Sequence, residues 1–457
     1  MTYPAFGFVT PRNMALLMDL YELVMADSYL REDMNEPATF DLFVRTLPPR
    51  RSFLVSAGLE AALHYLEHFH VDDEMIAYLR GLGQFSDAFL DYLRRFRFTG
   101  EVWAIPEGEI FFPPEPVLEV IGPRIEAQIV ETFLLNAVNY QVMVASKGAR
   151  VVLAARERGV VDFSPRRDHG ADAAMKAARA SYIAGCVGTS NVLAGMEYGI
   201  PVYGTMAHSY IMSFPDELSA FRAFARDYPT NAILLIDTYD TIQGARHAVI
   251  VAQEMAARGE QLRGVRIDSG DLAPVSRQVR EIFDSAGLPD VQILLSGDLD
   301  EYRIAEVLAR GAAANAFGVG TALGTSEDAP TMGGVYKIVE DRHGPKIKLS
   351  TGKATLPGRK QVWRRQTSGG PRDTIALEHE AAPRGCEPLL VNVMAQGRAV
   401  RPESLQEMRA RCRARLGALP QAFTDLQTVP PSPVGLSREL EALQGAMFQK
   451  NETRRRP

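Results

Sequence analysis

The chain contains few cysteines. Only three occur in 457 residues, namely Cys186, Cys386 and Cys412, and no two of them form a CxxC pair. An odd number of widely spaced cysteines argues against a disulfide scaffold and against a cysteine-based zinc site. Their scarcity fits a protein of the reducing cytoplasm.

Long apolar runs and a dominant sign of charge are also missing. No run approaches the roughly 18–20 residues of a membrane span, and no basic-then-apolar segment reads as a signal peptide. The 50 Lys and Arg residues against 56 Asp and Glu residues leave a formal net charge of -6, which calls for neither a nucleic acid nor a membrane as partner. The length of 457 residues and the 46% hydrophobic content are enough for more than one domain. Together with the absences above, they lead us to expect a soluble cytoplasmic protein.

Short apolar segments alternate with helical patterns in the middle of the chain. Buried strands are predicted at "VVDF", "GIPVYG", "AILLID", "GVRID", "VQILLS" and "ANAFGVG", with a helical pattern after each of the first five. This repetition predicts an α/β fold with a parallel sheet, closed or nearly closed into an irregular β/α barrel at residues 126–330.

The flanking segments have a different texture. Residues 1–125 combine helical patterns, such as Met14–Leu30, with β-rich runs in "TGEVWAIPEGEIFFPPEPVLEVIG" that are broken by Pro and Gly. Residues 331–457 begin with "GGVYKIVE", "PKIKLS" and "KQVWRR", which predict strands joined by turns, and end in a helical tail. We therefore expect a second domain that is mainly antiparallel β with helices.

Polar residues and glycines follow the predicted strands. They form the segments 163–167 (FSPRR), 208–209 (HS), 237–240 (DTYD), 266–271 (RIDSGD), 296–298 (SGD) and 318–321 (GVGT). A glycine after a strand is more often only a turn, and an aspartate there is more often a helix N-cap. Their recurrence at successive strand ends, which open onto one face of a barrel, predicts a functional site at this mouth.

The residue types indicate the class of ligand. Arginines bind phosphates and carboxylates, glycine-rich turns present backbone N–H groups to a phosphate, and aspartates suit Mg²⁺ and ribose hydroxyls. The combination predicts a phosphorylated sugar bound with Mg²⁺. The chain lacks a P-loop, an HExxH motif, a nucleophile elbow and the kinase motifs.

Several motifs resemble those of the nicotinate phosphoribosyltransferase family. They include "DLYELVMADSYL", the block from "DFSPRRDHGADAAM" to "MAHSYIMSF", "LIDTYDT", "VRIDSGDL", "LLSGDLDE", "FGVGTAL" and "GRKQVWR", in order from about Asp19 to Arg364. The family commonly has F-G-x-R-R, whereas this chain has Ser164 and Pro165 after the Phe.

The resemblance implies a two-domain enzyme in which strands of the C-terminal segment return to the N-terminal domain. The family transfers phosphoribosyl from 5-phosphoribosyl-1-diphosphate to nicotinate, giving nicotinate mononucleotide and diphosphate for NAD biosynthesis. It couples this transfer to ATP hydrolysis through a phosphohistidine, requires Mg²⁺, and works as a homodimer with shared active sites.

The resemblance also implies roles for individual residues. For nicotinate, Phe163 and the partner subunit's Tyr21 can stack on the ring, Arg166 or Arg167 can pair with the carboxylate, and Ser190 stands where nicotinamide-specific relatives have Asp. Without the resemblance, Tyr21 reads as a core residue and Ser190 as a helix cap. For the sugar diphosphate, the candidates are Arg266, Asp268, Asp237, Ser296, Gly297, Asp298, Gly318, Gly320 and Thr321, with Asp237 and Asp268 also proposed for Mg²⁺.

A histidine after a strand is usually structural, but neutral imidazole is a good phosphoryl acceptor. His208, in "GTMAHS", is therefore the expected phosphohistidine, and His169 is the rival. Alternative functions are a nicotinamide- or quinolinate-specific phosphoribosyltransferase, a phosphate-binding barrel isomerase or aldolase, and a non-catalytic relative. The isomerase reading requires a lysine or carboxylate base at a strand end, and these ends contain no lysine.

Overall fold

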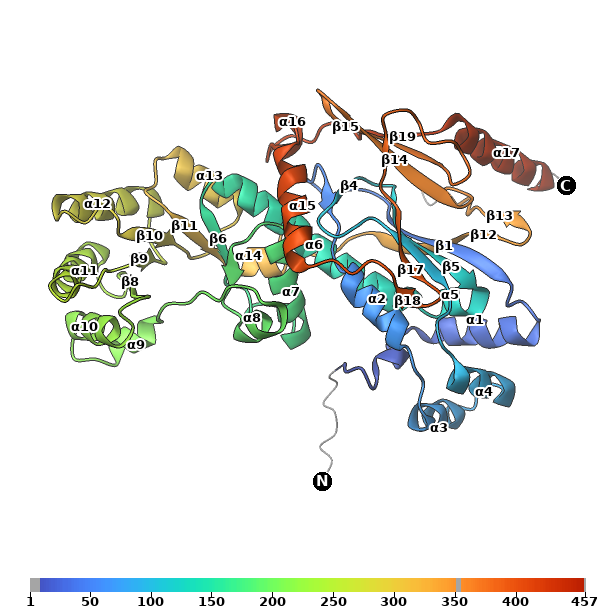
Figure 1. Ribbon diagram of the computed structural model, residues 1–457, viewed down its shortest axis with the longest axis horizontal. Helices are drawn as coiled ribbons and strands as arrows, with labels where there is room; N and C mark the ends of the chain where they lie inside the picture. Colours follow the sequence, from blue (N-terminus) through green and yellow to red (C-terminus); the bar gives the residue numbers. More distant parts are fainter. Residues whose placement is uncertain (1–8, 351–354, 456–457) are drawn as a thin grey trace. The chain divides into compact units, whose positions relative to one another are not determined.

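The computed structural model of the chain describes residues 9–350 and 355–455, and the contacts within it form two compact units (Figure 1). One unit joins the residues up to Met143 to those from Thr331 onward, and the other is Val144–Pro330. The first boundary lies within helix α6 (Glu131–Ala155), whereas the sequence reading placed it at residue 126; both place the second after Pro330.

A six-stranded parallel sheet forms the centre of the Val144–Pro330 unit. Its strands are β6 (Gly159–Asp162), β7 (Gly188–Thr189), β8 (Ile233–Leu235), β9 (Gly264–Ile267), β10 (Gln292–Leu295) and β11 (Ala316–Val319). Their order in the sheet is β7-β6-β11-β10-β9-β8. Around a ring, this is the order of the strands along the chain, and the ring is open between β7 and β8. The prediction of an irregular β/α barrel is confirmed, and the carboxyl ends of these strands share one edge.

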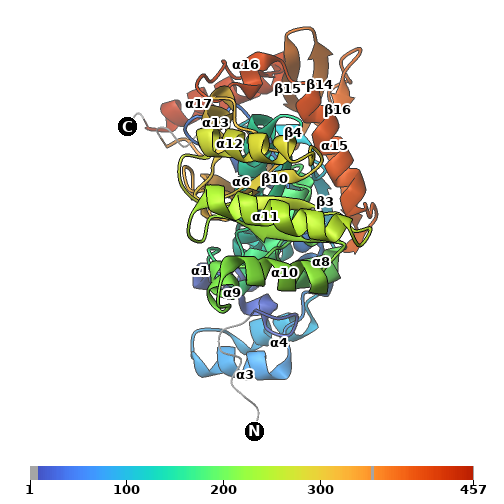
Figure 2. The same cartoon turned by 90° about the vertical axis from the view of Figure 1, so that its left-hand side faces the viewer.

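Helices connect these strands. They are α7 (Ala171–Ile183), α8 (Val192–Tyr198), α9 (His208–Met212), α10 (Glu217–Asp227), α11 (Thr241–Ala256), α12 (Leu272–Ser285), α13 (Glu301–Ala309) and α14 (Thr321–Gly324). Figure 2 shows α10, α11 and α12 side by side, covering the outer face of the sheet. The side chains of Asp240 and Asp300 accept backbone N–H groups at the starts of α11 and α13, which is the N-cap role of aspartate.

The prediction of a buried strand at "GIPVYG" is wrong. This segment has a single β-bridge, between Val202 and Thr189, and Val202 and Tyr203 are 49% and 43% exposed. The two-residue strand β7 just before it was not predicted, because two residues carry no hydrophobic pattern. His208 consequently begins the short helix α9 and does not directly follow a strand.

The other unit is built on mainly antiparallel sheets, in which only the pairing of β15 with β19 is parallel within the described residues. The largest has the order β13-β12-β1-β5-β3-β17-β18, made of β1 (Pro37–Val44), β3 (Glu101–Ala104), β5 (Pro116–Pro123), β12 (Gly334–Asp341), β13 (Gly344–Pro345), β17 (Val391–Ala395) and β18 (Arg398–Ala399). A smaller sheet contains β14 (Lys360–Thr367), β15 (Gly370–Leu377), β16 (Glu387–Pro388) and β19 (Val434–Leu436), and β2 (Leu54–Val55) pairs with β4 (Ile110–Phe111). Because β12 pairs with β1, the segment after Pro330 shares a sheet with the N-terminal segment.

Helices cover these sheets. They are the 3₁₀ turn η1 (Met14–Leu16), α1 (Leu20–Arg31), α2 (Leu59–His68), α3 (Asp73–Gly81), α4 (Asp87–Arg95), α5 (Arg124–Gln128), α15 (Leu405–Gly417), α16 (Gln421–Thr424) and α17 (Arg438–Arg455). The helix expected over Met14–Leu30 is thus divided into η1 and α1. Only Gly344–Pro345 of the strand expected around "PKIKLS" pairs. No helix of the described residues is long and apolar enough to cross a membrane.

Candidate active site

An aromatic ring, an arginine and a glycine meet at the carboxyl ends of three barrel strands. Phe163 follows β6 and is held by its backbone N–H, which donates to the Val319 carbonyl at 2.8 Å. Its ring lies against Gly318 so closely that a Cβ built on this glycine would be 2.4 Å from the ring. The guanidinium carbon of Arg266, on β9, is 5.9 Å from the ring centre, within the range of a cation–π contact.

Two aspartates lie beside this ring and are tied to one another. The Asp237 Oδ2 accepts the backbone N–H of Asp268 at 2.9 Å and the hydroxyl of Ser269 at 2.7 Å. The Asp268 Oδ1 in turn accepts the hydroxyl of Ser296 at 2.5 Å and faces Arg266 Nη2 at 3.3 Å. The Oδ1 of Asp237 is buried and has no hydrogen-bond partner within the described part of the chain, so it is available to a ligand or a cation.

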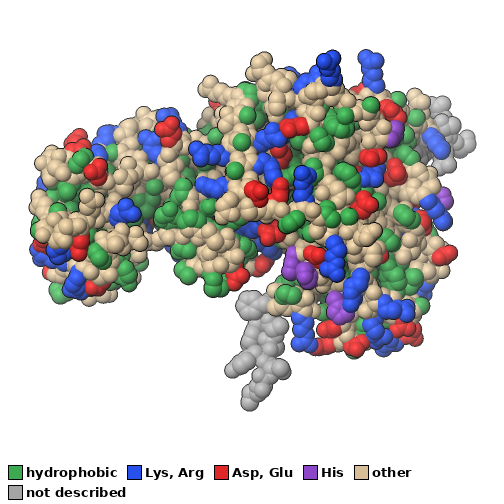
Figure 3. All heavy atoms as spheres, in the orientation of Figure 1, with side chains coloured by type: hydrophobic (Ala, Val, Ile, Leu, Met, Phe, Trp, Pro, Cys, Tyr) green, Lys and Arg blue, Asp and Glu red, His purple; other side chains and the backbone are tan. Residues whose placement is uncertain are grey.

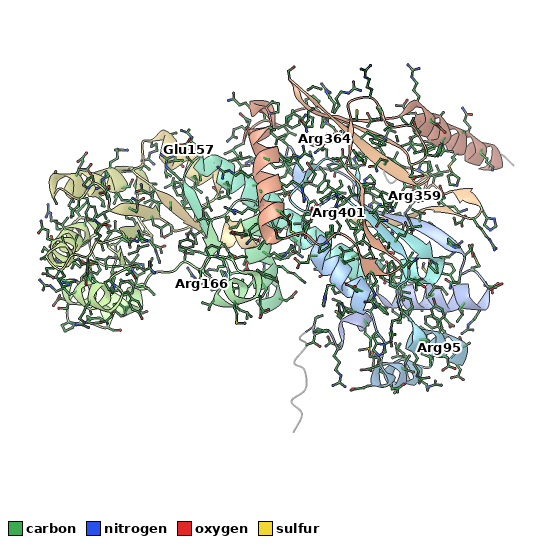
Figure 4. The ribbon with its side chains drawn as sticks, in the orientation of Figure 1. Arg95, Glu157, Arg166, Arg359, Arg364 and Arg401 are labelled. Carbon is green, nitrogen blue, oxygen red and sulfur yellow. The ribbon has the colours of Figure 1, made fainter. Side chains whose placement is uncertain are left out.

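The loop after β6 forms a tight turn that carries both candidate nicotinate arginines. The Ser164 carbonyl accepts the N–H groups of Arg167 and Asp168, and the Ser164 hydroxyl donates to Asp168 Oδ2 at 3.0 Å. Burial, followed by the charge of Asp162, raises the pKa of Asp168 to about 6. Arg166, on this turn, is labelled in Figure 4 and is exposed.

A cavity of about 350 Å³ joins these parts. Most of the predicted substrate residues line it, and they are Phe163, Arg166, Arg167, Asp268, Ser296, Gly297, Asp298, Gly318, Gly320 and Thr321. Leu299, Asp300, Ala322 and Glu327 complete the lining and were not predicted. Gly297 has a φ of +92°, and a Cβ there would lie 1.9 Å from the Asp268 carbonyl oxygen, so the turn requires glycine.

His208 lies outside the lining of this cavity but is connected to it. Its Nδ1 is 3.1 Å from the hydroxyl of Thr238, the residue after Asp237. Two residues before α9, Met206 accepts a weak hydrogen bond from Arg266 Nη1 at 3.4 Å, and Thr205 Oγ1 accepts a stronger one at 2.9 Å. The guanidinium of Arg266 therefore bridges the His208 segment and Asp268. Thr205 was not singled out from the sequence, and Thr238 was singled out only as part of the segment 237–240, without a role.

Ser190 and Tyr21 are placed differently from the residues that line the cavity. The backbone N–H of Ser190 donates to the Asp162 carbonyl at 2.8 Å, but Ser190 does not cap the next helix, because the N-cap of α8 is Asn191. Tyr21, on α1, belongs to the other unit and is 45% exposed, so it is not a core residue.

Sequence reasoning also missed the buried carboxyl at the end of β6. Asp162 accepts the Thr189 hydroxyl at 2.7 Å and the Ser164 N–H at 2.9 Å, and burial raises its pKa. It joins β6, β7 and the arginine turn into one hydrogen-bonded unit. An aspartate inside the apolar run "VVDF" was the signal that pointed to it, since buried carboxyls need partners.

The sequence models of the nicotinate phosphoribosyltransferase (NAPRTase) N-terminal domain and family match residues 16–139 and 159–340, respectively. The chain belongs to the nicotinate phosphoribosyltransferase family. Its relatives include nicotinate phosphoribosyltransferase pncB2 of Mycobacterium tuberculosis, 48% identical over 93% of this chain and 91% of that protein. The Bacillus subtilis nicotinate phosphoribosyltransferase is 42% identical over 77% of this chain and 73% of its own.

Two solved structures have a similar fold. The crystal structure of human nicotinic acid phosphoribosyltransferase has a TM-score of 0.85 and 30% identity, covering 94% of this chain and all of that one. A nicotinate-nucleotide pyrophosphorylase from Pyrococcus furiosus has a TM-score of 0.75 at 26% identity, over 91% and 99% of the two chains. The family resemblance seen in the motifs is thus confirmed.

Proposed function

We propose that this protein transfers phosphoribosyl from 5-phosphoribosyl-1-diphosphate to nicotinate, giving nicotinate mononucleotide and diphosphate for NAD biosynthesis. The observation that carries the proposal is the packing of the Phe163 ring on Gly318, beside Arg266 and at the edge of a cavity that Arg166 and Arg167 also line. A flat aromatic acid needs a ring to stack on and a guanidinium for its carboxylate.

The reaction needs no general base. The nicotinate ring nitrogen has a lone pair, which forms the bond to C1 of the ribose while the C1–O bond breaks and its electron pair leaves with diphosphate. Positive charge grows at C1 and negative charge on the leaving group. Arg266 can stabilise the diphosphate, Asp268 and Asp237 can orient the sugar, and the rigid ring of Phe163 can hold the attacking nitrogen in line.

The acidic pair also fits Mg²⁺. Asp237 offers a buried carboxylate oxygen without a hydrogen-bond partner among the described residues, and Asp268 lies beside it. No group of three or more metal-binding side chains occurs in the described ranges, so most oxygens around the ion would come from the diphosphate and water, the usual arrangement for Mg²⁺. When bound, Mg²⁺ would neutralise charge on the leaving group.

ATP coupling is proposed to run through His208. If Nδ1–H donates to Thr238, Nε2 keeps a lone pair and can accept the γ-phosphoryl group, forming an N–P bond as the P–O bond to ADP breaks. The phosphoryl group adds close to two negative charges near Arg266. These charges would compete for the guanidinium and change the affinity for the sugar diphosphate, and hydrolysis of the N–P bond would then reset the cycle.

A homodimer with shared sites is the proposed assembly. An exposed apolar stripe runs from the end of η1 onto α1. It is made of Leu17, which directly follows η1, and of Leu20, Tyr21 and Val24 on α1. Figure 3 shows hydrophobic side chains gathered over α8, where Val192 and Met196 are more than two-thirds exposed, at 72% and 71%. Surfaces of this kind usually mark protein contacts, and they support a partner's Tyr21 stacking on nicotinate.

The function is tested by incubating purified protein with nicotinate and the sugar diphosphate, with and without ATP, and measuring nicotinate mononucleotide. Nicotinamide and quinolinate serve as competing substrates, and exclusive use of either would replace the proposed substrate. His208→Ala should abolish ATP hydrolysis and acid-labile labelling from γ-labelled ATP, while a weak ATP-independent transfer remains. Labelling that persists in His208→Ala but is lost in His169→Ala would identify the other histidine.

The shared site has its own test. Tyr21→Ala and Asp268→Ala proteins should each be nearly inactive, and mixing them should restore activity, because a hybrid dimer contains one site free of both substitutions. No recovery after demonstrated subunit exchange would mean that Tyr21 does not serve a neighbour's site.

A further inference from the structure

A buried ion cluster lies behind one wall of the cavity. Lys147, in the middle of α6, has a side chain that is 1% exposed, and its Nζ is 2.5 Å from Glu301 Oε2 and 2.8 Å from Asp328 Oδ1. One turn later, Arg150 Nε donates to Glu301 Oε1 at 3.0 Å. Two cations and two carboxylates thus balance. Lys147, Arg150 and Glu301 are buried, where an unbalanced charge is costly, whereas the Asp328 side chain is 27% exposed.

The two carboxylates belong to the two segments that form the cavity wall. Glu301 is the first residue of α13, directly after Asp300, and the cavity lining runs from Ser296 to Asp300. Asp328 directly follows Glu327, which lines the cavity from the segment after α14. Lys147 contacts both segments at once, so it fixes their separation. Figure 1 shows α13 and α14 next to the part of α6 that belongs to this unit.

The ion cluster around Lys147 also affects the net charge beside the cavity. Asp268, Asp298, Asp300 and Glu327 line the cavity together with Arg166 and Arg167, so further negative charge beside it would weaken the binding of an anionic ligand. Lys147 and Arg150 neutralise Glu301 and Asp328 directly behind this wall. Without Lys147, the cluster behind this wall would carry one uncompensated negative charge.

We propose that Lys147 is a positioning residue for the sugar-diphosphate subsite: it clamps Glu301 and Asp328 together and so holds the two segments that form this wall of the cavity. The inference rests on the proposed function, because it takes 5-phosphoribosyl-1-diphosphate as the ligand of this cavity. Lys147 does not touch the ligand, so its loss should change binding of the sugar diphosphate more than the chemical step or the binding of nicotinate.

Two variants separate the positioning effect of Lys147 from the effect of its charge. Lys147→Met keeps the side-chain volume but removes both the clamp and the charge balance. Lys147→Met/Glu301→Gln removes the clamp but takes away one cation and one carboxylate together, so the net charge of the cluster stays at zero. Lys360→Met is the matched control, because Lys360 is equally buried, pairs with Asp41 at 2.9 Å, and lies in the antiparallel-sheet unit.

The experiment measures binding of 5-phosphoribosyl-1-diphosphate by calorimetry, the KM of each substrate, kcat and Tm. Lys147→Met should raise the KM for the sugar diphosphate on the order of tenfold, since a displacement of about 1 Å in a supporting element can cost up to a hundredfold. The double variant should lose less, and the KM for nicotinate should change little in both. Lys360→Met should lower Tm without changing any KM.

The outcomes are distinguishable. If the wild-type protein does not bind the sugar diphosphate, the proposed function fails. If it binds and both Lys147 variants bind it equally well, the positioning role is wrong and the cluster serves stability alone. Should Lys147→Met fail to fold, the charge-balanced double variant decides: wild-type affinity overturns the inference, and a loss confined to the sugar diphosphate supports it.

Discussion

Gly318→Ala adds one methyl group where β11 passes the ring of Phe163. The new Cβ would lie 2.4 Å from ring atoms Cδ2 and Cε2, whereas ordinary contact begins at 3.4 Å, so the ring must move by 3.4 − 2.4 = 1.0 Å. The φ of Gly318 lies outside the left-handed region, so backbone strain does not add to the effect. The substitution therefore displaces the proposed nicotinate platform without changing its chemistry.

A displacement of about 1 Å at a positioning group costs up to about a hundredfold in rate, and overpacking costs about 1–3 kcal/mol of stability. We expect kcat/KM for nicotinate to fall ten- to a hundredfold, which corresponds to roughly 1.4–2.7 kcal/mol, together with a lower Tm. The KM for the sugar diphosphate should rise less, because the new methyl group would lie 3.3 Å from the Cβ of Ser296, a much milder contact than that with the ring.

The assay is steady-state formation of nicotinate mononucleotide at varied nicotinate, with Tm measured on the same preparations. Gly445→Ala, on α17, is the control, because a Cβ there meets nothing within 4 Å. In Phe163→Leu/Gly318→Ala the smaller side chain should restore Tm but not nicotinate binding. A Gly318→Ala enzyme with wild-type KM and kcat for nicotinate would refute the placement of this ring at the nicotinate subsite.

Three further changes give distinct readouts. Ser190→Asp should weaken nicotinate use roughly a hundredfold, because a second carboxylate would face that of the substrate; unchanged nicotinate kinetics would remove Ser190 from the site. The pKa of Asp168 is raised from 3.8 to about 6. The native state therefore holds this proton up to a higher pH than the unfolded chain does, and the contribution of Asp168 to stability falls as the pH rises from about 4 to about 6. The Tm of Asp168→Asn relative to wild type should therefore rise from about pH 4 to about pH 7, and a constant difference would contradict the shifted pKa. Thr238→Val removes the partner of His208 Nδ1 and should reduce phosphohistidine labelling while ATP-independent transfer is retained; equal labelling would show that the hydroxyl does not orient the ring.

Much of the barrel could be predicted because most of its strands show the same hydrophobic pattern. Parallel strands buried on both faces read as short apolar runs, and their carboxyl ends share one edge, which brings together residues far apart in the chain. Asp268 and Ser296 illustrate this, since they belong to successive β/α units and their side chains are 2.5 Å apart. The spacing of such residues predicts proximity but not the hydrogen bond itself.

Other parts could not be predicted, for identifiable reasons. Hydrophobic side chains at Val202 and Tyr203 suggested a buried strand, but hydropathy records which residues avoid water and not which surface covers them. The link from Lys147 to Glu301 and Asp328 joins positions separated by most of the barrel, and no local pattern signals it. Thr238 lies within a segment that was singled out, yet only the structure shows that its hydroxyl meets His208.

The turn that carries Arg166 and Arg167 shows how the departure from the family's glycine at position 164 is accommodated. Ser164 is fully buried, so its hydroxyl must find a partner within the protein, and Asp168 Oδ2 accepts it at 3.0 Å. That carboxylate needs room, which Gly324 supplies: a Cβ there would lie 1.8 Å from Asp168 Oδ1 and 2.6 Å from Ser164 Oγ. Gly324 is the last residue of α14, which begins directly after Gly320. The turn that bears the arginines and this glycine-rich segment, a candidate for binding the sugar diphosphate, therefore pack against each other at Ser164, Asp168 and Gly324. The side chain at Ser164 therefore closes the arginine turn with a hydrogen bond that glycine cannot form, and Gly324 leaves the room for that closed turn to pack against α14.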